Sequence, residues 1–114
     1  MKPSDEMVSR VADEQLADIV RRLVAALSPR AVYLFGSHAC GTPGPDSDID
    51  IYITLEDALL ERDDCDERAY ACLRGLFLPI ELHIEGADAF ERRSSVVGSV
   101  EHDVRTQGRL LYAA

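Results

Sequence analysis

The sequence has no apolar run that approaches the ~20 residues that a membrane-spanning helix requires. Its first ten residues, MKPSDEMVSR, are polar and include acidic side chains, which is unlike a secretory signal peptide. We therefore expect a cytoplasmic protein that makes no contact with a membrane.

Basic side chains are also scarce, because the chain has 12 Lys and Arg residues against 21 Asp and Glu residues, for a formal net charge of −9. Binding to nucleic acid through counterion release requires Lys and Arg beside phosphates, so no direct nucleic-acid binding is expected. A bound phosphate is instead expected to arrive with a divalent cation. The negative charge suits either docking to a basic protein partner or simple solubility.

Cysteine is also scarce, with three residues in the chain. Cys40, Cys65 and Cys72 form neither a CxxC pair nor a zinc-binding pattern. Reduced thiols are therefore expected. A chain of 114 residues, 46% of them hydrophobic, has enough apolar surface for one core. We expect one domain over residues 1–114.

The spacing of apolar residues predicts helices that alternate with strands. The predicted helices cover residues 16–27, with an N-terminal cap at Ser4, then 56–76 and 87–107. The predicted strands cover residues 31–35, 49–53, 79–84 and 109–112, the first of them buried on both faces. Gly98 weakens the helical pattern of 87–107. The alternation indicates an α/β or α+β fold with helices packed on a sheet, and it leaves the strand order open.

Carboxylates occupy one face where the second predicted strand begins. Asp48 and Asp50 alternate with isoleucines, so their side chains are expected to share a face, and a cation between them would offset their repulsion. Oxygen ligands favour Mg²⁺ or Mn²⁺. Glu81 lies on the polar face of the third predicted strand, so it can supply a third carboxylate on the same side of the sheet.

Two other interpretations of these acids were open. The acidic positions of a calcium-binding loop are matched by Asp46, Asp48, Asp50 and Asp57. However, Ile51 occupies the position at which that loop requires Gly, and the alternating isoleucines favour a strand. The other interpretation is a solvated strand edge without a ligand, which applies to Glu81 as well.

The segment before the carboxylates offers a place for phosphate. Gly36 ends the first predicted strand and lets the backbone come close to a ligand, and Ser37 adds a hydroxyl at the start of a helical turn. His38 could reach the same phosphate or serve only in packing. His83 shares the face of Glu81, where it could orient Glu81 or touch a nucleotide, although a partly exposed structural role is the simpler interpretation.

One motif joins these segments: Phe35-Gly36-Ser37, a spacer of ten residues, then Asp48-Ile49-Asp50. The pattern resembles the minimal nucleotidyltransferase family of the polymerase-beta-like nucleotidyltransferase superfamily. The residues that match that family's motif are Gly36, Ser37, Ala39, Gly41, Ser47, Asp48 and Asp50. PIELHI corresponds to the family's third carboxylate strand and TQGRLLY to its closing segment, so the resemblance spans most of the chain. It implies a nucleotidyltransferase (polymerase-beta-like) fold, a small mixed β-sheet with helices packed on it.

The resemblance also implies a site and a reaction. Asp48, Asp50 and Glu81 would bind two Mg²⁺ ions, and Glu81 would activate an attacking hydroxyl. Gly36, Ser37 and Ser47 would bind the triphosphate of ATP, the nucleotide substrate. The hydroxyl would attack the α-phosphorus in line and release pyrophosphate. Two departures from the family are Cys40, where Arg is frequent, and Glu81, where Asp is usual.

Members of this family often act as antitoxins of small helical HEPN ribonuclease toxins. The resemblance therefore implies that this chain transfers AMP to a tyrosine of such a toxin and forms a hetero-oligomer with it. Two alternatives remain open at this stage: an antitoxin that blocks its partner by binding alone, with a vestigial metal site, and a nucleotidyltransferase that modifies a small molecule. The second usually needs a further substrate-binding domain, for which 114 residues leave little room.

Overall fold

The computed structural model describes residues 13–40, 48–61 and 64–114. The strands in this part of the chain are β1 (Ala31–Phe35), β2 (Ile49–Leu55), β3 (Ile80–Gly86) and β4 (Arg109–Ala113). They form one mixed sheet in the order β3-β2-β1-β4, in which β2 is parallel to β3 and β1 is antiparallel to both β2 and β4. The expected small mixed sheet is thus confirmed, and its strand order is now defined.

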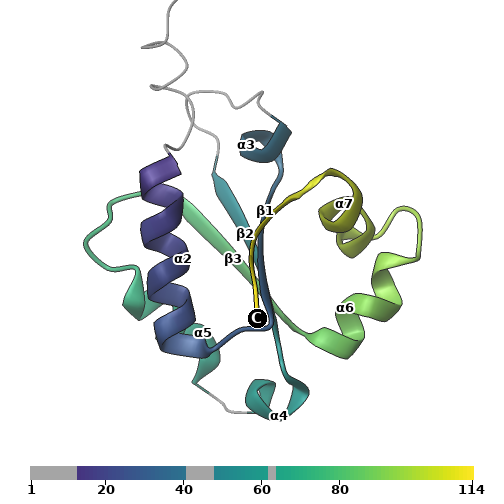
Figure 1. The fold of residues 1–114 in the computed structure, drawn as a ribbon, viewed down its shortest axis with the longest axis horizontal. Coiled ribbons are helices and arrows are strands. Elements are labelled where there is room, and N and C mark those ends of the chain that lie inside the picture. The colour runs from purple at the N-terminus through teal and green to yellow at the C-terminus, as the bar shows by residue number, and fades with distance from the viewer. Residues whose placement is uncertain (1–12, 41–47, 62–63) are drawn as a thin grey trace, which may run out of the picture.

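Helices lie on both faces of this sheet (Figure 1). The helices of the described residues are α2 (Asp13–Leu27), α3 (Ser37–Cys40), α4 (Asp57–Leu60), α5 (Cys65–Cys72), α6 (Ala87–Ser94) and α7 (Val100–Gln107). α2 and α5 cover one face, and α6 and α7 cover the other. α3 follows β1 at one end of the sheet and α4 follows β2 at the opposite end. No helix within these described segments is long and apolar enough to span a membrane.

The main core lies between the sheet and helices α2 and α5. Three isoleucines of β2, each at most 2% exposed, point into it: Ile49, Ile51 and Ile53. α2 contributes four buried residues at helical spacing: Leu16, Ile19, Leu23 and Leu27. The predicted helix 16–27 is therefore confirmed, as is the division of β2 into two unlike faces.

A second, smaller cluster covers the other face of the sheet. Tyr52 of β2 packs there with Phe90 of α6 and Val104 of α7, and all three are buried. Tyr33 and Phe35 of β1 are half buried against this cluster. The prediction that β1 is buried on both faces is therefore confirmed only for the face of Val32 and Leu34, because its other face is partly exposed.

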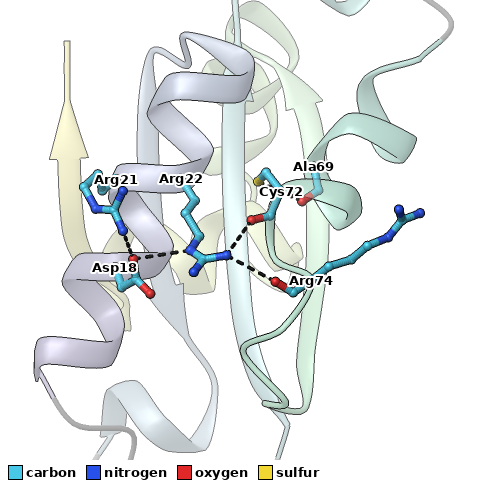
Figure 2. A network of polar contacts seen from close by, with 6 residues as sticks. All are labelled: Asp18, Arg21, Arg22, Ala69, Cys72 and Arg74. Atoms are coloured by element: carbon cyan, nitrogen blue, oxygen red, sulfur yellow. Dashed lines mark hydrogen bonds and ion pairs between the residues drawn. The ribbon is translucent and has the colours of Figure 1, made fainter.

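One arginine joins the two helices of the main-core face (Figure 2). Arg22 of α2 donates from Nη1 to the carbonyl oxygens of Cys72, at 3.1 Å, and Arg74, at 3.2 Å. These carbonyls lie at the C-terminal end of α5, where no helical N–H remains to pair with them. Asp18 accepts a 3.3 Å bond from Nε of the same arginine and also pairs with Arg21. Arg22 therefore fixes α5 against α2.

The predicted helix over 56–76 is wrong as one element, because α4 ends at Leu60 and α5 begins at Cys65. The charged stretch between them offers only Cys65 as an apolar residue, so a continuous helix would bury little there. The break instead lets the Cys65 thiol donate to the carbonyl oxygen of Leu59, at 3.3 Å, and pack in the core. α5 then ends at Cys72, before Gly75 adopts a φ of +89°.

The predicted helix over 87–107 is likewise two helices, α6 and α7, with residues 95–99 between them. Gly98, which the sequence marked as the weak point, has a φ of +94°, a value that ends helical geometry. Ser99 then caps α7, because its hydroxyl oxygen accepts a 3.0 Å hydrogen bond from the backbone N–H of His102. The bend allows Phe90 and Val104 to pack in the same cluster. The predicted cap at Ser4 lies outside the described residues.

Candidate functional site

The end of β1 and the beginnings of β2 and β3 meet at one end of the sheet. Phe35 is paired with Asp50 across β1 and β2, and Asp50 is paired with Glu81 across β2 and β3. Asp50 lies on the face of β2 opposite the core isoleucines, and Glu81 lies on the matching face of β3. The expectation that these two carboxylates share one side of the sheet is confirmed.

Asp50, Glu81 and His83 form a group whose possible ligand atoms all lie within 4.8 Å of one another. Asp50 and His83 are half buried, and Glu81 is exposed at β3, an edge strand of the described sheet. Asp48 directly precedes β2, is exposed, and is not among these three. From sequence, a structural role is the simpler interpretation of His83, with orientation of Glu81 or contact with a nucleotide as the alternatives. The signal for its place here was the strand alternation, which puts it on the same face as Glu81.

The electrostatics of this group centre on Asp50. Partial burial raises the pKa of the Asp50 carboxyl, and the negative charge of Glu81 raises it further. His83 opposes that rise, while the charge of Asp48 adds to it. Ionised Asp50 is therefore disfavoured by its surroundings, and a cation beside it would offset that cost.

Gly36 is the residue that lets the chain turn beside Asp50. Its φ is +77°, and a β-carbon built on it would lie 2.5 Å from Oδ2 of Asp50. Any other amino acid would be strained at this φ, and its β-carbon would force the Asp50 carboxylate to move. The helical turn expected after it exists as α3, which begins at Ser37, and the N–H of Ala39 donates to the carbonyl oxygen of Gly36 at 3.1 Å. Ser47, the other residue predicted to bind the triphosphate, lies outside the described residues.

Aromatic rings hold His83 in place. The ring of Phe35 meets the imidazole nearly edge-on at a centroid distance of 5.1 Å, and the ring of Tyr52 lies parallel to it at 6.2 Å. Tyr52 is itself fixed, because its hydroxyl donates to Oε2 of Glu101 on α7 at 2.7 Å. Burial, followed by that hydrogen bond and the charge of Glu101, raises the pKa of Tyr52 far above the usual range for tyrosine. Tyr52 therefore stays protonated, and its ring is held in one position beside His83.

Two solved structures are similar in fold to this chain. A protein from Sulfolobus solfataricus that was assigned as a nucleotidyltransferase superposes with a TM-score of 0.60 at 18% identity, over 88% of this chain and 78% of that one. A toxin-antitoxin structure determined with AMP-PNP superposes with a TM-score of 0.56 at 25% identity, over 85% of this chain and 73% of that one. No curated protein matches the sequence.

The sequence itself matches a family model described as the nucleotidyltransferase domain, over residues 13–105. The match covers the sheet strands β1 to β3 and the carboxylates that they carry. The fold agrees with it, since the end of β1, Gly36 and the acidic ends of β2 and β3 lie together. The chain belongs to the nucleotidyltransferase domain family.

Proposed function

We propose that this protein is a metal-dependent nucleotidyltransferase that transfers AMP from ATP to a tyrosine of a partner HEPN ribonuclease toxin and so acts as its cytoplasmic antitoxin. The observation that carries the proposal is the group of Asp50, Glu81 and His83 beside Gly36, in a chain of the nucleotidyltransferase domain family. An acidic group at this place has the chemistry that a phosphoryl-transfer site needs.

The side chains present fit a divalent cation. Asp50 and Glu81 offer carboxylate oxygens within 4.8 Å, and Asp48 lies close enough for its charge to raise the pKa of Asp50. We assign Asp48, Asp50 and Glu81 as the residues that would hold Mg²⁺, with two ions as the expected number. When bound, the cation supplies positive charge that stabilises the phosphoryl group in the transition state.

The residues of the chain then have distinct roles. Glu81 accepts the proton of the tyrosine hydroxyl while the phenolic oxygen of that tyrosine forms a bond to the α-phosphorus. The bond from the α-phosphorus to the bridging oxygen breaks, and pyrophosphate leaves with that electron pair. Gly36 allows the backbone to approach the triphosphate, for which Ser37 and Ser47 are the proposed hydroxyl contacts. Because Glu81 is exposed on an edge strand, a side chain of another protein can reach it.

Two observations support a protein acceptor and an adenine nucleotide. The toxin-antitoxin structure with AMP-PNP, to which this chain is 25% identical, pairs this fold with a partner and an adenine nucleotide. The net charge of −9 suits a complex with a basic partner. A stable hetero-oligomer of the two proteins is the expected form.

The test uses the chain purified together with the product of its neighbouring gene, if that product is a small helical protein. We expect label to pass to the partner from α-labelled ATP and not from γ-labelled ATP. Asp50→Asn removes a ligand charge with little change of shape and should abolish transfer. Asp66→Asn, the same substitution on α5 on the opposite face of the sheet, is the matched control and should leave transfer intact.

Each contrary result has a clear meaning. Label from γ-labelled ATP alone would identify a kinase. If the wild-type chain neutralises its partner without transferring label, and Asp50→Asn neutralises it equally well, then the protein is an antitoxin that works by binding alone.

A further inference from the structure

His83 lies in the carboxylate group and also packs against the rings of Phe35 and Tyr52. In the parallel pairing of β2 with β3, Asp50 is opposite Glu81 and His83 is opposite Tyr52, so all three polar groups are on one face. A nitrogen of the imidazole lies within 4.8 Å of an oxygen of each carboxylate. Metal–ligand bonds are about 2.0–2.2 Å long, so two ligand atoms of one ion lie at most about 4.4 Å apart. Small side-chain rotations would bring the three groups to that spacing.

The orientation of this ring is set before any ion binds. Phe35 contacts it nearly edge-on and Tyr52 lies parallel to it, while the Glu101 hydrogen bond fixes Tyr52. The described residues include no hydrogen-bond partner for either ring nitrogen of His83. A half-buried imidazole held in this way loses little conformational entropy when it becomes a ligand.

The nature of the donor decides which ion is favoured. Mg²⁺ prefers oxygen ligands and retains much of its water, whereas imidazole nitrogen suits first-row transition metals. Mn²⁺ accepts carboxylate oxygen as Mg²⁺ does, and as a transition metal it binds imidazole nitrogen more strongly than Mg²⁺ does, though less strongly than the later metals of its row. A site in which an imidazole joins the carboxylates therefore differs in ion preference from a site of carboxylates alone.

We propose that His83 is a nitrogen ligand of the divalent cation held by Asp50 and Glu81, and that it gives this site a preference for Mn²⁺ over Mg²⁺. The inference rests on the proposed function, because it concerns the metal of that same site. It adds a residue and an ion preference that the carboxylate motif does not contain.

The direct test is pulsed electron paramagnetic resonance of Mn²⁺ added to the purified full chain. A directly bound histidine modulates the electron spin echo through its nitrogen nucleus. The modulation should change when the protein is grown with histidine that carries the heavier nitrogen isotope, a comparison that alters no residue. It should vanish in His83→Phe, which keeps an aromatic ring against Phe35 and Tyr52 but removes the nitrogens.

A matched control is needed because the chain has three histidines. His102→Gln changes a histidine of α7 whose Nδ1 lies 3.0 Å from the carbonyl oxygen of Ser94, away from the carboxylates, and should leave the modulation unchanged. Thermal unfolding of each variant verifies that it is folded. Calorimetric titration should show Mn²⁺ binding weakened at least about tenfold in His83→Phe and Mg²⁺ binding weakened by no more than about twofold.

Three results would overturn the inference: no Mn²⁺ bound to the wild-type chain, bound Mn²⁺ without nitrogen modulation, or modulation that persists in His83→Phe. The proposed function is decided separately, by label transfer with Mg²⁺. Transfer without nitrogen modulation would remove only the role of His83. Nitrogen modulation without transfer in either ion would keep this metal site and remove the proposed reaction.

Discussion

A β-carbon at Gly36 would lie 2.5 Å from Oδ2 of Asp50, so the absence of a side chain at Gly36 is what allows the α3 turn to sit against the carboxylate. We predict that Gly36→Ala displaces Asp50 and lowers nucleotidyl transfer by about 100-fold, since small misplacements in a reacting site are costly. The φ of +77° adds a strain of about 1–2 kcal/mol, measurable as a lower melting temperature.

Gly75 provides the matched control for that variant. Its φ of +89° is equally unfavourable for alanine, but nothing lies within 4 Å of the position of its β-carbon. Gly75→Ala should therefore lose a similar amount of stability and keep full transfer activity. Equal losses of activity in both variants would show that general destabilisation, and not the contact with Asp50, is responsible.

Asp50 itself should make the metal-free protein less stable at neutral pH. Its pKa is raised above 3.8, chiefly by burial and then by Glu81, so the fold penalises its ionised form. The penalty is absent below pH 3.8, grows as the pH rises through the folded-state pKa, and is constant above it. Asp50→Asn should raise the melting temperature in a chelator at pH 7, and this gain should disappear on acidification.

Metal ions should make the wild-type chain more stable than Asp50→Asn, the reverse of the order expected in chelator. Mg²⁺ or Mn²⁺ should raise the melting temperature of the wild-type chain, because they bind the folded state, and should have little effect on Asp50→Asn. Unfolding followed by circular dichroism with and without chelator measures both effects. A variant that is less stable than the wild type in chelator at pH 7 would contradict this description of Asp50.

Much of this arrangement could be predicted from sequence because the side-chain period of a strand is two. The alternation around Asp50 and around Glu81 fixed which face each carboxylate takes, and the pairing of the two residues across β2 and β3 agrees with it. The alternation does not predict the distances between the side chains that share a face. Asp48 and Asp50 have the same periodicity, yet only Asp50 belongs to the group with Glu81 and His83, and Asp48 directly precedes β2.

The errors in the helices have a different cause. Residues 56–76 and 87–107 each have apolar residues at helical spacing, which a helix–turn–helix can satisfy as well as one helix. The breaks depend on tertiary packing: Cys65 reaches the main core, and Phe90 and Val104 reach the same cluster over Tyr52. The place of His83 beside the carboxylates depends in the same way on the pairing of β3 with β2, which the sequence does not give.

The Arg22 contacts should matter for stability and not for chemistry. Arg22→Ala removes the donor to the carbonyl oxygens of Cys72 and Arg74, and we expect a loss of about 1–2 kcal/mol in the free energy of unfolding. Arg21→Ala, on the same helix but largely exposed, should cost less than about 0.5 kcal/mol. Chemical denaturation measures both, and transfer activity at low temperature should be unchanged. Equal losses of unfolding free energy in the two variants would show that the contacts of Arg22 between α2 and α5 do not contribute specifically to stability.

Tyr52 should make the stability of the fold decrease at alkaline pH. Its hydroxyl donates to Glu101 at 2.7 Å, and its pKa is raised by burial first and then by Glu101, so the fold favours the protonated phenol. The resulting stability is complete below the pKa of about 10 of an unfolded tyrosine and is lost as the pH rises beyond it. Tyr52→Phe should lose about 1–2 kcal/mol at pH 7, a difference that shrinks above about pH 10.

Tyr33→Phe is the control for the loss of a hydroxyl. Tyr33 stacks on Phe90 at a centroid distance of 5.3 Å, and no hydrogen bond of its hydroxyl is found among the described residues. The free energy of unfolding of the Tyr33→Phe variant should differ from that of the wild type by less than about 0.5 kcal/mol. If Tyr33→Phe costs as much as Tyr52→Phe, the hydrogen bond to Glu101 is not the source of the effect.

The central claim is that the group around Asp50 transfers a nucleotide to a partner protein. The most direct measurement is the intact mass of the partner purified from cells that co-express it with the wild-type chain or with Asp50→Asn. We predict that the wild-type chain adds the mass of at least one AMP moiety, located on a tyrosine by fragmentation, and that Asp50→Asn binds the partner but leaves its mass unchanged. An unmodified partner beside the wild-type chain, or a modified one beside Asp50→Asn, would contradict the claim.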